Sequence, residues 1–273
     1  MNTGNAAAGK LPALYRVPSQ SVPCTVAAKS RIERCFGDPL FLADWDEPVF
    51  LHFEIDPEIL QPHIPFPLDT RNGKAYITLV AFTMRNMRFR KGGDRARALT
   101  KPIANHSFLN LRTYVIQNGE PGIHFICEWL NSRLATTLGP ITFGLPYRFG
   151  EIKYDHNYTD NTYRGTVRHG NRTVSYEATS DPDDEWKPCE SGTLDEFLLE
   201  RYTAFTARWK WKGLFRVWHH AWPQKRLMKL KITDLSLLET APGAGKWVSH
   251  LKPVGGNVST GADDVWMSRP HLK

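Results

Sequence analysis

The segment His106–Leu130, HSFLNLRTYVIQNGEPGIHFICEWL, decides the fold class. Two runs rich in aromatic and β-branched residues flank the connection Asn118–Gly122, which contains two glycines and a proline. Glycine adopts positive φ angles and proline fixes φ, so this connection has the residues that a tight turn requires. The segment predicts a β-hairpin with strands over residues 106–117 and 123–130.

The faces of this hairpin carry polar side chains that suit a binding site. Alternation along the first strand places Asn110, Arg112 and Tyr114 on one face, which is either solvated or lines a wet interior. In an interior, the guanidinium of Arg112 is suited to bind a carboxylate. Alternation on the second strand groups His124 with Glu128. Glu128 then either pairs with Arg112 across the strands or takes part in ligand binding itself.

Short strand patterns continue on both sides of the hairpin, and the polar stretch 91–104 reads as a loop. Asp56 and Pro57 predict the start of a short helix, and the capping box Thr193–Glu196 predicts another that runs to about residue 206. One or two helical turns are expected at 131–137. Further strands are expected at 49–54, 74–90, 143–154, 162–169, 173–179, 208–212, 227–238 and 247–251. About ten strands and two or three helices indicate an α+β, mainly β protein.

Length and composition favour one globular domain. The chain has 273 residues, of which 41% are hydrophobic, and no linker divides it. Residues 1–30 are small, polar and interrupted by prolines, which indicates a flexible N-terminal arm. We expect a single β-rich domain over residues 31–268.

The sequence lacks the motifs of several protein classes. It has no apolar run of the length that a signal peptide or a membrane span needs, which favours the cytoplasm. The four cysteines have no zinc-ligand spacing and are expected to be reduced thiols. No nucleotide-binding or hydrolase motif is present. We therefore expect no metal and no cofactor.

Positive charge is concentrated in residues 201–231, which hold nine basic side chains and no acidic one. Interleaved tryptophans in this segment are typical of single-stranded nucleic acid or acidic-membrane binding. Alternation over 208–212 places Trp and Lys on opposite faces, however, so a solvated face is favoured and nucleic acid is disfavoured.

Two further places offer candidate site residues. Gly144-Leu145-Pro146 predicts a tight turn from which Tyr147 and Arg148 project. Tyr202 follows the capped helix, and His219 lies in a Trp-rich segment. An imidazole is suited to proton transfer because its unperturbed pKa is near neutrality. Each of these also has an ordinary structural interpretation.

Several segments in this order resemble the YqjF-like family, a bacterial family grouped by fold with acetoacetate decarboxylase. The matching stretches are FLHFEIDPEILQPHIP, LDTRNGKAYITLVAFTMRNMRFR, NLRTYVIQNGEPGIHFICEWLNSRLA, FGLPYRF, GTLDEFLLERY and HHAWPQ, which together span about residues 45–224. The resemblance implies an acetoacetate-decarboxylase-like fold: a curved, mostly antiparallel β barrel or sandwich around a small cavity, with a few peripheral helices.

The resemblance implies this fold without the decarboxylase chemistry. Acetoacetate decarboxylase forms a Schiff base on a lysine that follows a Gly-x-Pro turn. Here Tyr147 and Arg148 follow that turn, and a tyrosine forms no Schiff base.

We expect the protein to bind a small anionic or keto-type ligand in the barrel, through Arg112, Tyr114, Glu128, Arg148, Tyr202 and His219. If it is an enzyme, Tyr147 and His124 are the expected acid–base residues of a lyase or isomerase without a Schiff base. Arg148 would then lower the phenol pKa of Tyr147. The alternatives are a non-catalytic binding or interaction module with a decayed site, and nucleic-acid binding through residues 201–231. The oligomeric state is left open, and a homo-oligomer is compatible with the sequence.

Overall fold

The computed structural model describes residues 23–35, 37–208 and 211–272. The helices are α1 (Pro23–Glu33), α2 (Pro57–Leu60), α3 (Gly93–Thr100), α4 (Arg133–Thr142) and α5 (Leu194–Leu199), with short 3₁₀ turns η2 (Gln61–His63), η3 (Lys101–Ile103), η4 (Ser236–Thr240), η5 (Ala244–Lys246) and η6 (Val248–His250). The strands are β1 (Phe41–Ile55), β2 (Ala75–Phe89), β3 (His106–Gln117), β4 (Glu120–Leu130), β5 (Tyr147–Phe149), β6 (Glu151–Asn157), β7 (Thr162–His169), β8 (Arg172–Ser180), β9 (Thr203–Arg208), β10 (Trp211–Trp218), β11 (Gln224–Asp234), β12 (Lys252–Ser259), β13 (Gly261–Met267) and β14 (His271–Leu272).

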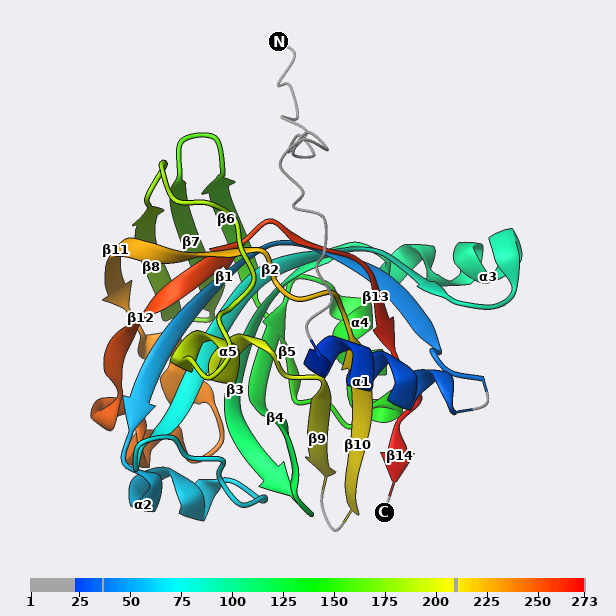
Figure 1. The fold of residues 1–273 in the computed structure, drawn as a ribbon, viewed down its shortest axis with the longest axis horizontal. Coiled ribbons are helices and arrows are strands. Elements are labelled where there is room, and N and C mark those ends of the chain that lie inside the picture. The colour runs from blue at the N-terminus through cyan, green and yellow to red at the C-terminus, as the bar shows by residue number, and fades with distance from the viewer. Residues whose placement is uncertain (1–22, 36, 209–210, 273) are drawn as a thin grey trace.

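Seven strands form a ring of pairings. They follow the order β13-β10-β9-β4-β3-β2-β1, and β13 also pairs with β1. Two joints of the ring are short, because β4–β9 and β10–β13 each pair over only two residues. Most neighbours are antiparallel, while β4 is parallel to β9 and to β5. The expected curved, mainly β architecture is confirmed (Figure 1).

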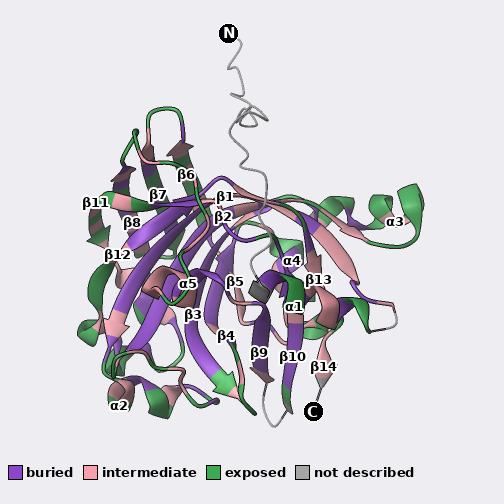
Figure 2. Ribbon diagram, viewed as in Figure 1, coloured by how far each residue is buried: buried purple, intermediate pink, exposed green. Residues whose placement is uncertain are grey.

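Strands β12, β11, β8, β7 and β6 extend the sheet beyond β1 (Figure 1). Leu51 of β1 and Leu111 of β3 pack in one apolar cluster with Tyr163 of β7 and Tyr176 of β8. A second cluster on the other face of the central strands includes Phe50 and Phe108. The central strands are therefore buried on both faces (Figure 2).

The N-terminal arm expected over residues 1–30 is in part a helix. Residues 1–22 lie outside the described chain, but residues 23–33 form α1. Ile32 of α1 is fully buried and packs with Tyr202 and Trp218. The indole Nε1 of Trp218 donates a hydrogen bond to the carbonyl of Thr25 at 3.0 Å. This anchorage depends on distant residues, which explains why local composition pointed to a loose arm.

Several element predictions were wrong. Residues 93–100, expected as a loop, form α3, and residues 247–251 lie in 3₁₀ turns and not in a strand. Helix α5 begins at the predicted cap but ends at Leu199, so that β9 can join the ring. Residues 208–212, predicted as one strand, include the connection between β9 and β10, and residues 209–210 there are outside the described chain.

The state of the cysteines and the character of the helices can be compared with the sequence expectations. The thiols of Cys35, Cys127 and Cys189 are free, as expected for reduced cysteines. Within residues 23–35, 37–208 and 211–272, no helix combines the length and the apolar character needed to cross a membrane.

Candidate functional site

A cavity of about 360 Å³ lies inside the ring of strands. Every strand of the ring contributes to its lining, and most of the lining side chains are aromatic or aliphatic. Leu99 of α3 and Leu138 of α4 line the cavity and are also exposed, so the cavity reaches the surface beside these two helices. The composition of the wall favours a mainly apolar ligand.

Unpartnered polar groups sit in this apolar wall on the central hairpin. The buried Asn110 Oδ1, Arg112 Nε and Glu128 Oε2 have no hydrogen-bond partner within the described structure. Burying a polar atom without a partner costs about 1–3 kcal/mol. A ligand that hydrogen-bonds to these atoms would recover that free energy.

A β-bulge in β4 determines which of its side chains reach the cavity. Leu111 lies opposite Cys127, whereas the next residue, Arg112, lies opposite Phe125, so Ile126 is the extra residue. Both Phe125 and Glu128 therefore line the cavity. The prediction that His124 and Glu128 share a face was wrong, because alternation is interrupted at the bulge.

Glu128 is a buried carboxyl group without a counter-ion. It lies opposite Asn110 and not opposite Arg112, so the expected pairing of Arg112 with Glu128 does not form. No ion pair joins Glu128 to any described cation. Burial raises the pKa of Glu128 well above its usual range. Burial therefore favours the neutral form of Glu128, which can donate a hydrogen bond.

Tyr147 lies next to Glu128, because β5 runs parallel to β4 with Tyr147 opposite Glu128. Burial, and secondarily the neighbouring Glu128, raise the phenol pKa of Tyr147 well above its usual value. The expectation that Arg148 lowers this pKa was wrong. Arg148 does not line the cavity, and its Nη1 donates to the carbonyl of Thr240 at 2.5 Å. Tyr147 is thus a hydrogen-bond donor at neutral pH.

Arg112 is the cation of the cavity that lacks a carboxylate partner within the described chain. It is 9% exposed, and its Nη2 donates to the carbonyl of Leu198 in α5 at 2.9 Å. Its guanidinium lies 5.7 Å from the ring centroid of Phe50. The other arginine in the lining, Arg201, already pairs with Asp69 at 2.7 Å. Arg112 therefore retains the capacity to bind an anion.

Three predicted site residues are engaged outside the cavity lining. Tyr114 Oη is 2.7 Å from Thr78 Oγ1 and donates to the carbonyl of Leu198 at 2.9 Å. Tyr202 donates to the Glu200 carboxylate. His124 Nδ1 is 2.9 Å from the carbonyl of Phe205.

His219 does line the cavity, but as a neutral imidazole. Burial lowers its pKa to about 4. Its Nδ1 is 2.6 Å from the carbonyl of His220, and its ring lies 4.5 Å from that of Trp222. The structure therefore brings Arg112, Glu128, Tyr147 and His219 to one space, while Tyr114, Arg148, Tyr202 and His124 lie outside its lining.

Among the polar side chains of the cavity that sequence reasoning missed, His106 and Trp45 have unpartnered atoms. His106 Nδ1 and Trp45 Nε1 are buried without partners, and both residues line the cavity. Alternation along β3 could have identified His106, which lies on the same face as Asn110 and Arg112. Trp45 lies between two irregularities in the β1–β2 register, so alternation gives no signal there.

The basic segment 201–231 forms no platform of free cations among its described arginines. Arg201 pairs with Asp69, Arg216 with Glu120 and Arg226 with Asp195. The predicted alternation at Trp209 and Lys210 lies outside the described residues. These ion pairs give no support to nucleic-acid binding.

Comparison with known proteins places the chain among relatives of this fold. The model of the DUF2071 family, described as an uncharacterised conserved protein, matches residues 42–254. The chain is 31% identical over 182 residues to the uncharacterised protein YqjF of Bacillus subtilis, an alignment that covers 65% of this chain and 72% of YqjF.

Solved structures with the same fold are distant in sequence. An acetoacetate decarboxylase-like enzyme from Sphingomonas wittichii RW1 superimposes with a TM-score of 0.60 at 13% identity, covering 86% of this chain and 94% of that one. The enduracididine biosynthesis enzyme MppR in complex with pyruvate gives 0.59 at 14% identity, covering 86% and 90%. Acetoacetate decarboxylase from Legionella pneumophila gives 0.56 at 13% identity, covering 100% and 98%.

Proposed function

The chain belongs to the DUF2071 family, and we propose that it binds a small organic acid with an apolar body inside the ring of strands. The observation that carries this proposal is Arg112, a buried guanidinium that faces an apolar cavity and has no carboxylate partner among the described residues. A ligand carboxylate would supply the missing charge, and the aromatic wall would bury the rest of the molecule.

Hydrogen-bond donors near Arg112 support a carbonyl or hydroxyl oxygen on the same ligand. Neutral Glu128 and Tyr147 both donate protons, whereas a carbonyl oxygen accepts them. Asn110, which lies opposite Glu128, offers an amide beside them. A keto acid therefore fits the donor set, and the similar protein MppR was solved with pyruvate.

The same groups define the chemistry if the bound acid is turned over. Hydrogen bonds from Glu128 or Tyr147 to a ligand carbonyl would polarise it, as the enolisation or hydration steps of a lyase or isomerase require. The lining that the structure describes contains no lysine, which agrees with a reaction without a Schiff base. We place this activity in the cytoplasm, as the sequence favours. Catalysis and simple storage or transport remain two outcomes of one binding site.

Calorimetric titration with straight-chain 2-oxo acids of increasing length tests the binding proposal. We expect affinity to rise with chain length until the cavity is filled, because each buried CH₂ contributes about 0.8 kcal/mol. Arg112→Gln should weaken binding by about tenfold or more, since it removes the charge-assisted hydrogen bond.

Arg148→Gln is the matched control, because Arg148 lies in β5, which pairs with β4, and outside the cavity lining. Its affinity should equal that of the wild type. Equal affinity of the Arg112→Gln variant and the wild type would overturn the proposal, as would a complete lack of binding by the whole series. Loss of turnover in Glu128→Gln or Tyr147→Phe with retained binding would favour an enzyme over a binding protein.

A further inference from the structure

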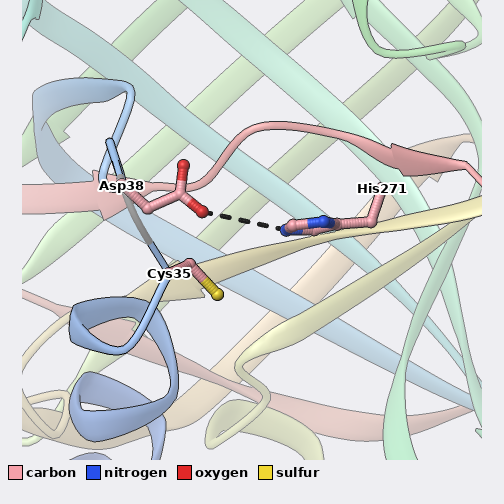
Figure 3. Close-up of side chains that lie close together, drawn as sticks. All are labelled: Cys35, Asp38 and His271. Carbon is pink, nitrogen blue, oxygen red and sulfur yellow. Dashed lines mark ion pairs between the residues drawn. The ribbon is translucent and has the colours of Figure 1, made fainter.

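Cys35 and Asp38, which follow α1, converge with His271 of β14 (Figure 3). One ligand atom from each side chain, a sulfur, an oxygen and a nitrogen, lies within 4.8 Å of the other two. We propose that these residues bind a zinc-like divalent cation, which ties the segment after α1 to the C-terminal strand β14.

Hydrogen bonds donated by backbone amides hold the two segments of this cluster together. The amide of Leu40 donates to the carbonyl of Met267 at 2.9 Å, and that of Arg269 donates to Asp38 Oδ1 at 3.1 Å. Strand β14 is fixed in turn by pairing with β10. Asp38 lies just before the paired strand β1, and His271 lies in the paired strand β14, so the two segments are already held close to each other.

The side-chain contacts leave room for a bridging ion. Asp38 Oδ2 and His271 Nε2 lie 3.8 Å apart, which is too long for a hydrogen bond. Zinc bonds to oxygen and nitrogen measure about 2.0–2.2 Å, so one ion can contact both atoms at this separation. His271 Nε2 is buried without a hydrogen-bond partner, and the Asp38 side chain is only 2% exposed. A buried carboxylate and an unpartnered imidazole nitrogen are the pair that a cation would satisfy.

The donor set selects the class of metal. Magnesium and calcium prefer all-oxygen sites, whereas a thiolate and an imidazole together favour zinc or a similar transition metal. The three protein ligands would leave a fourth position for water. The Sγ of Cys35 contacts the carbonyl of Arg31 at 3.5 Å, and its proton would pass to solvent when the thiolate binds the ion.

Arg90 Nη1 donates to the backbone carbonyl of Asp38 at 2.7 Å, and the Arg269 guanidinium competes with a cation for the Asp38 carboxylate. Arg269 Nε lies 3.8 Å from Asp38 Oδ1, and its side chain is 57% exposed. An exposed guanidinium at this distance contributes little, and it can turn towards solvent. The alternative to a metal site is thus an ion pair of Asp38 with Arg269 alone, and the two give opposite results on titration.

Titration of the full chain, freed of metal with a chelator, tests the proposal with Zn²⁺ and Co²⁺. We expect one Zn²⁺ per chain, an affinity that rises with pH because binding releases a proton, and a higher unfolding temperature when Zn²⁺ is present. Bound Co²⁺ should show a thiolate-to-metal charge-transfer band.

Variants assign the site. Cys35→Ser and His271→Gln should each lower Zn²⁺ affinity by about tenfold or more, and Cys35→Ser should abolish the charge-transfer band. The controls Cys189→Ser and His250→Gln remove the same residue types elsewhere and should bind as the wild type does. The inference is overturned if the wild type binds no Zn²⁺, or if both site variants bind it unchanged. Circular dichroism of the metal-free variants separates loss of binding from loss of folding.

Discussion

The Glu128 carboxyl group lies in an apolar wall without a neighbouring cation, which disfavours its ionised form. Burial raises its pKa, so Glu128 keeps its proton in the folded state and loses it in the unfolded state above about pH 4.3. Between the unfolded and the folded pKa the folded protein binds more protons than the unfolded one, so its free energy of unfolding falls as the pH rises, by at most about 1.4 kcal/mol per pH unit from this group. Glu128→Gln removes this dependence.

We therefore expect the stability difference between Glu128→Gln and the wild type to move in favour of the variant from pH 5 to pH 8. Urea unfolding at several pH values measures this difference. Glu151→Gln is the control, because Glu151 is an exposed glutamate paired with Arg168. A difference that does not change with pH would mean that Glu128 is ionised in the folded protein.

Burial of His52 makes the free energy of unfolding depend on pH in the opposite direction, so that it falls as the pH decreases. Burial lowers its pKa to about 4, and its two ring nitrogens lie 2.9 Å from Thr78 Oγ1 and Asn257 Oδ1. Since the folded pKa lies below the unfolded value of about 6.5, the stability from this group is complete above pH 6.5 and is lost as the pH falls through 4. His52→Asn should be less stable at pH 7 and lose less stability between pH 6.5 and 4.

Thermal unfolding at pH 7 and pH 4 tests this prediction, with the exposed His250→Asn as control. His106, His156 and His219 also have pKa values lowered to about 4 by burial, so the wild type should still lose stability in acid. A His52→Asn curve parallel to that of the wild type would contradict the assignment.

At the residue level, the sequence located part of the candidate site. Alternation along β3 correctly grouped Asn110 and Arg112, because this strand keeps its period through the cavity wall. It misassigned His124, because an inserted residue at Ile126 changes the face and leaves no local signature. Whether the residues that reach the cavity bind or turn over a ligand stays a prediction.

At the scale of elements, helix α4 packs directly against the Tyr147 ring, because its residue 139 is a glycine without a side chain. A Cβ on Gly139 would lie 2.2 Å from Cε2 of the Tyr147 ring, which no packing allows. Gly139→Ala must therefore displace the phenol relative to Glu128. We expect this variant to fold with a stability loss of about 1–3 kcal/mol from overpacking, and to lose affinity for 2-oxo acids.

Chemical unfolding and calorimetric titration of the same samples measure both effects. Gly245→Ala is the control, because a Cβ at Gly245 meets no atom within 4 Å. Wild-type affinity in Gly139→Ala would show that the position of Tyr147 does not matter to the ligand.

Elements with local signals were predicted, and those fixed by distant contacts were not. The β3–β4 hairpin has Asn118 and Gly119 at positive φ, and the α5 cap has Thr193 accepting from the amide of Glu196. Both features depend on residues that are close together in the sequence. In contrast, the end of α5 is set where β9 joins β4 and β10, which no short window of sequence contains.

At the scale of the molecule, closure of the ring creates the cavity. Motif order identified the fold family, but β13 pairs with both β1 and β10 through contacts between the two ends of the chain. Seven strands then enclose more volume than their inward side chains fill, which a linear pattern of residue types does not reveal.

Filling the cavity tests this closure directly. Ala204 of β9 is 1% exposed and lines the cavity, so Ala204→Leu adds three carbons to empty space. We expect the free energy of unfolding to rise by about 0.5–2 kcal/mol while affinity for 2-oxo acids falls. Ala178 of β8 is also buried, but it packs in the solid cluster on the other side of the sheet.

Ala178→Leu should therefore lose about 1–3 kcal/mol, because a filled core has no room for the same three carbons. Urea unfolding of the two variants compares an identical substitution in an empty and in a filled interior. A gain in the free energy of unfolding for Ala204→Leu and a loss for Ala178→Leu would show that the ring is hollow and the core beside it is filled. Equal destabilisation would mean that the ring is closed around its own side chains, and then Arg112 would face no space in which an organic acid could bind.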